Sequence, residues 1–192
     1  RYRGTECTAT ASTGNCSYDK VTPIRSDLSV PKLTVDLSGK GNLDVSHETV
    51  LDVNSKCSGN DICDIYYNAI NFGNDSRLVV RMPEEGRPTR IFVNKLNFGT
   101  HPQIVVNYQG KRELDLKDYE GNLLIYVNDD VILKNIDNVK IMGTIVSKGK
   151  ITLECNIIFA GQLIADNIYV GNEISAENFV FKKYDPPIEL SI

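Results

Sequence analysis

The chain of 192 residues is long enough for one hydrophobic core with a small cap. Its 41% hydrophobic and 24% charged content is that of a folded globular protein and excludes an intrinsically disordered one. The formal net charge of −4 supplies no basic face for phosphate, so neither nucleic acid nor an anionic membrane is predicted as a partner. No apolar run reaches the roughly 18 residues of a membrane-spanning helix, so no direct membrane insertion is predicted.

Residues 1–30 are rich in Thr, Ser and Gly and show little periodicity, which predicts an irregular N-terminal cap or coil. We interpret the polar start at Arg1 as that of a mature or truncated product whose targeting or anchoring segment has been removed. An exported, extracellular location is therefore expected.

Apolar and polar residues alternate through most of residues 31–185, the pattern of half-buried strands. Clusters of Gly, Pro, Asn and Asp separate the apolar runs, as expected for turns. One or two helical turns are predicted over 46–53 and again over 61–68. The sequence thus predicts a single all-β domain over 31–185, followed by a C-terminal tail at 186–192.

The last third of the chain repeats one strand pattern three times. Superposing the three copies places equivalent apolar residues in three columns. These columns are Ile125, Ile145 and Leu163; then Val131, Ile151 and Ile168; then Leu133, Leu153 and Val170. Self-similarity with a period of 17 to 20 residues is typical of a solenoid, in which each turn buries its apolar face on its neighbours.

A β-sandwich would show strands at irregular offsets, without columns, so a β-solenoid (β-helix) is the preferred architecture. Asparagines at Asn122, Asn138, Asn156 and Asn172 form a predicted ladder at corners, where a left-handed backbone is needed. Earlier in the chain the period drifts toward 13, at Leu78, Ile91 and Ile104. That drift indicates either shorter turns or an imperfectly coiled sheet.

The five cysteines fall into two close pairs and one isolated residue. We predict the disulfides Cys7–Cys16 and Cys57–Cys63, as in exported proteins, with Cys155 left as a thiol. The alternative is a four-thiolate metal site made from the two pairs, although neither pair has the two-residue gap of a zinc knuckle.

Residues that could support catalysis are few. His47 and His101 lie far apart in turn-like sequence, and solvated loop histidines are the preferred interpretation. Asp129 and Asp130 lie at a predicted corner, so the alternative function is a carbohydrate-active β-helix enzyme, a polysaccharide lyase or hydrolase, using these carboxylates. The preferred prediction is a protein without catalytic residues, metal or cofactor.

Three residues are candidates for a ligand-binding face. Strand alternation predicts that Tyr126, Gln162 and Tyr169 point outward, where aromatic and amide groups could contact a ligand. The competing interpretation is that they are ordinary surface residues.

Residues 120–185 resemble the closing repeats of bacterial exported β-solenoid modules. The resemblance rests on Gly-Thr-Ile-Val-Ser-Lys-Gly-Lys-Ile-Thr-Leu, on Ala-Gly-Gln-Leu-Ile-Ala-Asp-Asn-Ile-Tyr-Val-Gly-Asn, and on Phe-Val-Phe-Lys-Lys-Tyr-Asp-Pro-Pro, within residues 143–187. The modules concerned are the choice-of-anchor adhesin group, C-terminal domains of pilus-assembly proteins and, more distantly, ice-binding-like adhesion domains. Cys155 departs from the pattern, since Gly is common at that corner.

This resemblance implies a non-enzymatic structural or adhesive module of a bacterial surface or pilus-associated protein, which displays a stiff solenoid face. Its implied partners are other surface or pilus subunits, or a host or matrix glycan or protein. The repeats lack the rows of Thr that ice binding requires, because the partners of Thr144 and Thr152 one turn on are Gln162 and Tyr169. A self-assembling scaffold resembling the bactofilins is a further option. The sequence Asp-Pro-Pro at 185–187 argues against it, because it would cap the end of the solenoid and prevent further strand pairing there.

Overall fold

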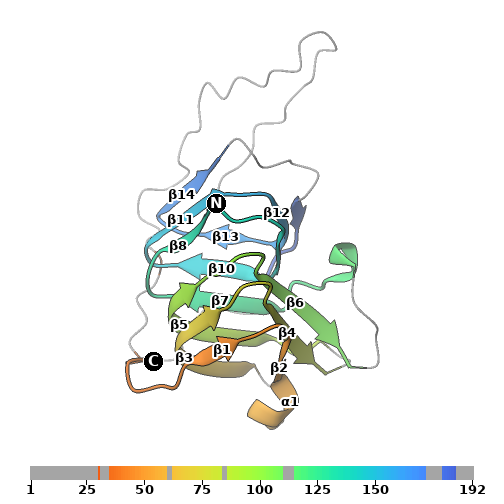
Figure 1. The fold of residues 1–192 in the computed structure, drawn as a ribbon. Coiled ribbons are helices and arrows are strands. Elements are labelled where there is room, and N and C mark those ends of the chain that lie inside the picture. The colour runs from red at the N-terminus through yellow and green to blue at the C-terminus, as the bar shows by residue number, and fades with distance from the viewer. Residues whose placement is uncertain are drawn as a thin grey trace.

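The chain folds into short strands that repeatedly join the same three sheets (Figure 1). The computed structural model describes residues 30, 35–59, 62–83, 86–109, 115–171 and 179–184. The predicted tail and almost all of the predicted N-terminal cap, including Cys7 and Cys16, lie outside the described residues.

In the described residues there are fifteen strands and two short helices. The earlier elements are β1 (Leu43–Val45), β2 (Thr49–Asp52), α1 (Val53–Lys56), β3 (Cys63–Phe72), β4 (Arg77–Met82), β5 (Thr89–Asn97), β6 (Gln103–Tyr108) and the 3-10 helix η1 (Leu116–Asp118). The later ones are β7 (Leu123–Val127), β8 (Val131–Lys134), β9 (Val139–Met142), β10 (Thr144–Ser147), β11 (Lys150–Glu154), β12 (Ile157–Gly161), β13 (Leu163–Ile164), β14 (Asn167–Val170) and β15 (Phe179–Phe181). The all-β prediction is confirmed.

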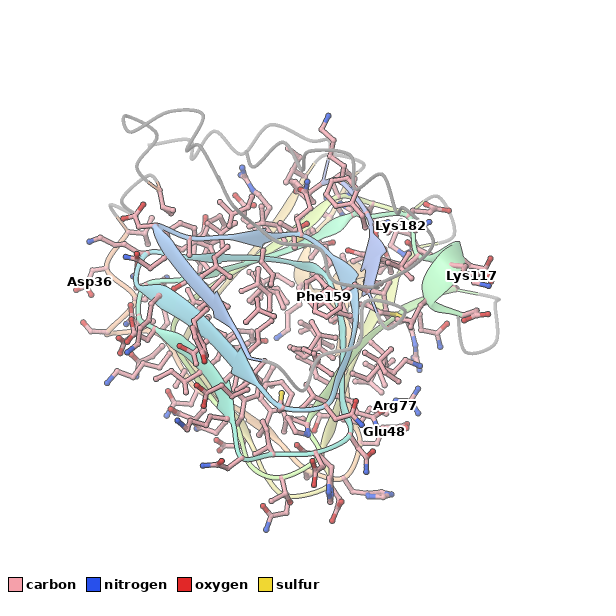
Figure 2. The ribbon with its side chains drawn as sticks, turned by 90° about the horizontal axis from the view of Figure 1, so that it is seen from above. Asp36, Glu48, Arg77, Lys117, Phe159 and Lys182 are labelled. Atoms are coloured by element: carbon pink, nitrogen blue, oxygen red, sulfur yellow. A yellow bond between two sulfur atoms is a disulfide. The ribbon has the colours of Figure 1, made fainter. Side chains whose placement is uncertain are left out.

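The three sheets are all parallel. Sheet A has the order β1-β3-β5-β7-β10-β13, sheet B has β15-β12-β9-β6-β4-β2, and sheet C has β14-β11-β8. From β7 onward, consecutive strands enter sheets A, C and B in turn. Figure 2, which looks down the stack, shows Phe159 inside the ring of strands, whereas Asp36, Glu48 and Lys117 lie outside it.

The predicted columns of the last third are confirmed by the register of the strands. In sheet A, Ile145 pairs with both Ile125 and Leu163. In sheet C, Ile151 pairs with Val131 and Ile168, and Leu153 pairs with Leu133 and Val170. In-register β-branched and leucine side chains stack along the interior at the strand spacing of about 4.8 Å, which keeps water out of the core.

The earlier region has a longer repeat than the sequence indicated. Ile91 pairs in sheet A with Ile65, 26 positions earlier, and Leu78 pairs in sheet B with Ile104, 26 positions later. The apparent period of 13 arises because consecutive strands alternate between sheets A and B. The alternative of shorter turns is therefore wrong.

The predicted helical turns are mostly strand. Residues 49–52 form β2, and only α1 follows, with the Asp52 side chain accepting a hydrogen bond from the Asn54 backbone N–H at 3.0 Å. Residues 63–68 belong to the ten-residue strand β3. These residues pair with β5, and the end of β3 at residues 70–72 also pairs with β1, which overrides the weak helical pattern.

Two buried tyrosines, Tyr108 and Tyr119, stabilise the connection between β6 and β7 through hydrogen bonds of their hydroxyl groups. The Tyr108 hydroxyl donates to Asn122 Oδ1 at 3.0 Å and accepts from the Glu120 N–H at 3.2 Å. The Tyr119 hydroxyl donates to the Leu123 carbonyl and accepts from the Leu123 N–H. Their bulk fills the core while their hydroxyls are satisfied, as buried phenols require.

The asparagine ladder in the structure is not the predicted one. Asn128 donates to Asn94, Asn94 to Asn68, and Asn68 to Asn42, at 2.9, 3.0 and 3.2 Å between Nδ2 and Oδ1. A shorter series parallel to it joins Asn97, Asn71 and Asp44. Of the predicted set, Asn138 has the left-handed φ of 51° expected at a corner, Asn122 binds Tyr108, and Asn172 lies outside the described residues.

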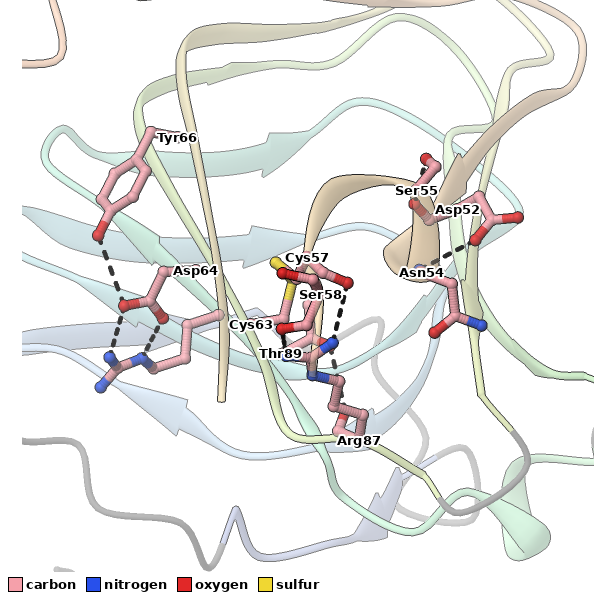
Figure 3. Close-up of a disulfide and its surroundings, with 11 residues drawn as sticks. Asp52, Asn54, Ser55, Cys57, Ser58, Cys63, Asp64, Tyr66, Arg87 and Thr89 are labelled. Atoms are coloured by element: carbon pink, nitrogen blue, oxygen red, sulfur yellow. Dashed lines mark hydrogen bonds and ion pairs between the residues drawn. A yellow bond between two sulfur atoms is a disulfide. The ribbon is translucent and has the colours of Figure 1, made fainter. Parts of the chain in front are cut away.

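A disulfide joins α1 to the start of β3 (Figure 3). Cys57 and Cys63 are bonded, with 5.7 Å between their Cα atoms, as predicted. The buried Arg87 guanidinium donates to the carbonyls of Cys57 and Ser58 at 3.1 and 3.2 Å, which holds the loop against the sheet. The four-thiolate alternative is wrong for this pair, because its sulfurs are oxidised; Cys155 is a buried thiol of the core.

Candidate functional site

The three predicted ligand residues occupy different parts of the molecule. Tyr126 lies on β7 of sheet A, Tyr169 lies on β14 of sheet C, and Gln162 lies between β12 and β13. Tyr169 is 57% exposed and Gln162 is partly buried. The Gln162 side chain accepts a hydrogen bond from the Tyr184 N–H at 3.3 Å, so its amide oxygen anchors a neighbouring segment.

Tyr126 is not an exposed contact residue. Its side chain faces away from the main core, as alternation predicts, but it is only 1% exposed. It belongs to a second apolar cluster, completed by Leu37 and Tyr184 from segments that precede and follow the stack of strands. Alternation predicts the side of the sheet on which a residue lies but not whether a distant segment covers it.

The outer face of sheet A is therefore covered at its centre, where Leu37 and Tyr184 pack against it. Phe92 stacks on Tyr66 with 5.2 Å between ring centroids and lies 6.0 Å from the ring of Tyr126. Arg90 forms a bidentate ion pair with Asp64, at 2.6 Å from Nε and 2.7 Å from Nη2. Hydrogen bonding to Asp64 raises the pKa of Arg90, which favours its charged guanidinium.

The outward positions of sheet B are also largely buried at its centre. Val79, Val105 and Met142 alternate with core-facing residues and are nevertheless buried. The η1 helix contacts β12, and the Lys182 ammonium donates to the Lys117 carbonyl at 2.7 Å (Figure 2). Two of the three sheets thus present few apolar groups to solvent at their centres.

Sheet C has a different outer face. Its central column is Ile132, Thr152 and Tyr169, which are paired across β8, β11 and β14. Ile132 is 47% exposed and Thr152 is partly buried. On the opposite face, Val131, Ile151, Leu133 and Leu153 are buried in the core. We call the outward column and its flanking residues Asp130, Lys150, Asn167, Lys134 and Glu154 the sheet C face.

The charges that flank the column are paired with one another. Lys134 Nζ lies 2.7 Å from Glu154 Oε2, and hydrogen bonding to that carboxylate raises the pKa of Lys134. Lys150 Nζ lies 3.8 Å from Asp130 Oδ2 on the other flank. The sheet C face therefore combines an apolar and aromatic strip with two neutralised flanks.

Ile132 and Thr152 were missed as candidate residues at the sequence level. Each follows a residue of the predicted core column, Val131 and Ile151, by one position, and Tyr169 follows Ile168 in the same way. Because side chains alternate along a strand, the predicted columns already implied a second, outward column. The missing step was to compare the outward residues of the three repeats.

Asp129 and Asp130, the candidate catalytic carboxylates of the alternative enzyme hypothesis, form hydrogen bonds and an ion pair with neighbouring residues. Asp129 Oδ1 accepts from the Asp130 N–H at 2.9 Å, and its Oδ2 lies 3.7 Å from Lys95 Nζ. Asp130 Oδ1 accepts from the Lys150 N–H at 2.9 Å, one turn further on. These contacts join successive turns, and they assign both carboxylates to the corner between β7 and β8.

The histidines occupy exposed loops. His47 lies between β1 and β2, and His101 Nδ1 lies 2.6 Å from Asp75 Oδ1 in stacked turns where both residues have positive φ. Within the described ranges, no group of three or more His, Cys, Asp or Glu side chains is arranged to hold a metal ion.

Among the residues with described positions, no helix is both long enough and apolar enough to cross a membrane. Comparison of the chain with protein-family models, with curated proteins and with solved structures gives no match.

Proposed function

We propose that the chain is a β-solenoid that serves as a non-enzymatic structural or adhesive module of an exported bacterial surface or pilus-associated protein. The observation that carries the proposal is the parallel pairing of strands from β1 to β15, which stacks each turn on the preceding one. The Cys57–Cys63 disulfide fits the extracellular location that this function requires.

Stiffness follows from how the turns are joined. Core columns connect each rung to the next, and hydrogen bonds between asparagine side chains add to them in the earlier rungs, so bending the stack would separate several contacts at once. A rigid stack holds an exposed face at a fixed distance and orientation from its point of attachment, which is what a display module must do.

The sheet C face is the proposed attachment surface. The outer faces of sheets A and B are covered at their centres, whereas Ile132 and Tyr169 remain about half exposed on sheet C. The partners that this function calls for are other surface or pilus subunits, or a host or matrix glycan or protein.

The proposal is tested by attachment under flow. Beads carrying the protein are passed over bacterial cell-wall sacculi, matrix polysaccharide, extracellular-matrix protein and a layer of the same protein. Thr152→Arg places a charge in the centre of the sheet C face, whereas Val50→Arg alters the exposed position of β2 and is the matched control. We expect wild-type and Val50→Arg beads to attach to at least one surface, and Thr152→Arg to reduce attachment at least about tenfold.

Attachment to none of these surfaces, or attachment that Thr152→Arg leaves unchanged, would contradict the proposal. The same preparations are incubated with a polysaccharide panel, and new reducing ends and unsaturated products are measured. Turnover that is abolished by Asp130→Asn would replace the proposed function with the enzyme alternative.

A further inference from the structure

The size of the sheet C face restricts what it can bind. Three strands at about 4.8 Å spacing, with four or five residues rising about 3.3 Å each, present roughly 200 Å². A stable protein–protein interface buries about 800 Å² on each partner. The face is therefore too small to hold a folded protein alone, but its area matches a few sugar rings.

Its electrostatics favour an uncharged ligand. The flanking charges balance each other in two ion pairs, Lys134–Glu154 and Lys150–Asp130, with nitrogen–oxygen distances of 2.7 and 3.8 Å. The two exposed pairs leave the face without net charge, so it offers no electrostatic attraction to an acidic or a basic polymer. A neutral polymer leaves both pairs in place.

The chemistry of the central column matches a sugar. The Tyr169 ring is 57% exposed and offers an apolar surface on which the C–H face of a pyranose can stack. The Thr152 hydroxyl and the Asn167 amide lie on the same face and form no side-chain hydrogen bond with described parts of the chain. They can therefore donate to and accept from ligand hydroxyl groups.

We propose that the sheet C face binds a short segment of a neutral polysaccharide, with one sugar ring stacked on Tyr169 and its hydroxyl groups bonded by Thr152 and Asn167. This inference rests on the proposed function, because it names the ligand class of the same attachment surface. The in-register strands place the column along one line across the sheet, which suits an extended chain of sugars.

The test uses microcrystalline cellulose, chitin and mixed-linkage glucan as neutral probes, with polygalacturonate as the acidic one. Bound protein is measured by pull-down and affinity electrophoresis at low and high salt. We expect at least one neutral probe to bind, with an affinity that changes less than about twofold with salt because no net charge is involved. Tyr169→Ala should weaken binding at least about tenfold, and Tyr169→Phe should retain it because the ring remains.

Phe181→Ala is the matched control, since Phe181 is 74% exposed but lies on sheet B. Thermal melting establishes that each variant is folded. The inference is overturned if no neutral probe binds, if Tyr169→Ala binds as tightly as wild type, or if only polygalacturonate binds. Beads that attach under flow without binding any neutral probe would remove the saccharide assignment alone, and beads that attach to nothing would remove the proposed function as well.

Discussion

The stack contains two regions, β1 to β6 and β7 to β15, that differ in how the strands of one turn are arranged and in which contacts join successive turns. Up to β6 the strands alternate between sheets A and B, β3 and β5 are ten and nine residues long, and equivalent residues recur every 26 to 29 positions. From β7 onward the strands enter three sheets and are two to five residues long. Polar side-chain ladders characterise the first region, and tight corners characterise the second.

The corners of the second region depend on close backbone approach. Gly161 has φ of 151°, and a Cβ at this position would collide with the Gly143 carbonyl of the preceding turn. Paired strands of neighbouring rungs lie only about 4.8 Å apart, so there is no room for a side chain at this corner and glycine is required. The first region has a similar contact, because a Cβ on Gly99 would collide with the Gly73 carbonyl, and its long strands also carry amide side chains that bond from rung to rung. The comparison shows that both regions share core columns and close backbone contacts, and that the long strands of the first region add hydrogen bonds between side chains.

The largest expected effect comes from charging the core column of the second region. Ile145→Asp would place a carboxylate between Ile125 and Leu163, where the native side chain is fully buried. We expect the free energy of unfolding to fall by more than about 4 kcal/mol, because the charge has no partner there. Because stacked turns contact mainly their neighbours, amides of β10 to β14 should lose hydrogen-exchange protection while those of β3 and β5 retain it.

Ile132→Asp is the matched control for this change, since Ile132 points outward on sheet C. Its melting temperature should stay close to that of the wild type. An Ile145→Asp variant that melts normally would show that the column is not buried, and uniform loss of protection would show that the two regions unfold as one unit.

The sequence indicated the second region better than the first for a physical reason. Its turns repeat after 17 to 20 residues, so three copies fall within a short segment and their aliphatic columns align. The first region also has three copies, but its turn is longer and its spacing less regular, so the copies are harder to align, although Asn42, Asn68 and Asn94 recur at steps of 26 and could have shown the repeat. The cover formed by Leu37 and Tyr184 could not be predicted, because local patterns do not specify which distant segments meet.

A smaller effect is expected from cutting the asparagine ladder of the first region. Asn94 donates to Asn68 and accepts from Asn128, so Asn94→Ala removes both bonds. We expect a loss of about 1 to 2 kcal/mol in denaturant unfolding, because the ladder is only partly buried and water replaces some of its bonds. Asn97→Ala, which removes the single bond to Asn71, should lose about half as much. Equal losses, or none for Asn94→Ala, would show that the ladder does not stabilise this region.

The smallest expected effects are changes in stability at alkaline pH caused by two tyrosines. Tyr108 lies in the connection between the two regions, and Tyr184 lies in the cover of sheet A. Burial raises the pKa of both Tyr108 and Tyr184 to about 12. Below pH 10 both phenols are neutral in the folded and the unfolded chain, and their contribution to stability is fully present. As the pH rises from 10 toward 12, the unfolded phenols ionise first, so stability is lost by about 1 kcal/mol per tyrosine at pH 11.

Substitution by phenylalanine separates the two sites. The buried Tyr184 hydroxyl forms no hydrogen bond with the described residues, so Tyr184→Phe should be neutral or slightly stabilising at pH 7 and more stable than wild type by about 1 kcal/mol at pH 11. Tyr108→Phe removes the bonds to Asn122 and Glu120, so it should be less stable at pH 7 and should approach wild type only at pH 11. Thermal melts at pH 7, 9.5 and 11 measure both differences. If Tyr184→Phe loses stability at alkaline pH as steeply as wild type, the phenol of Tyr184 does not remain covered in solution, and Leu37 and Tyr184 do not close the outer face of sheet A.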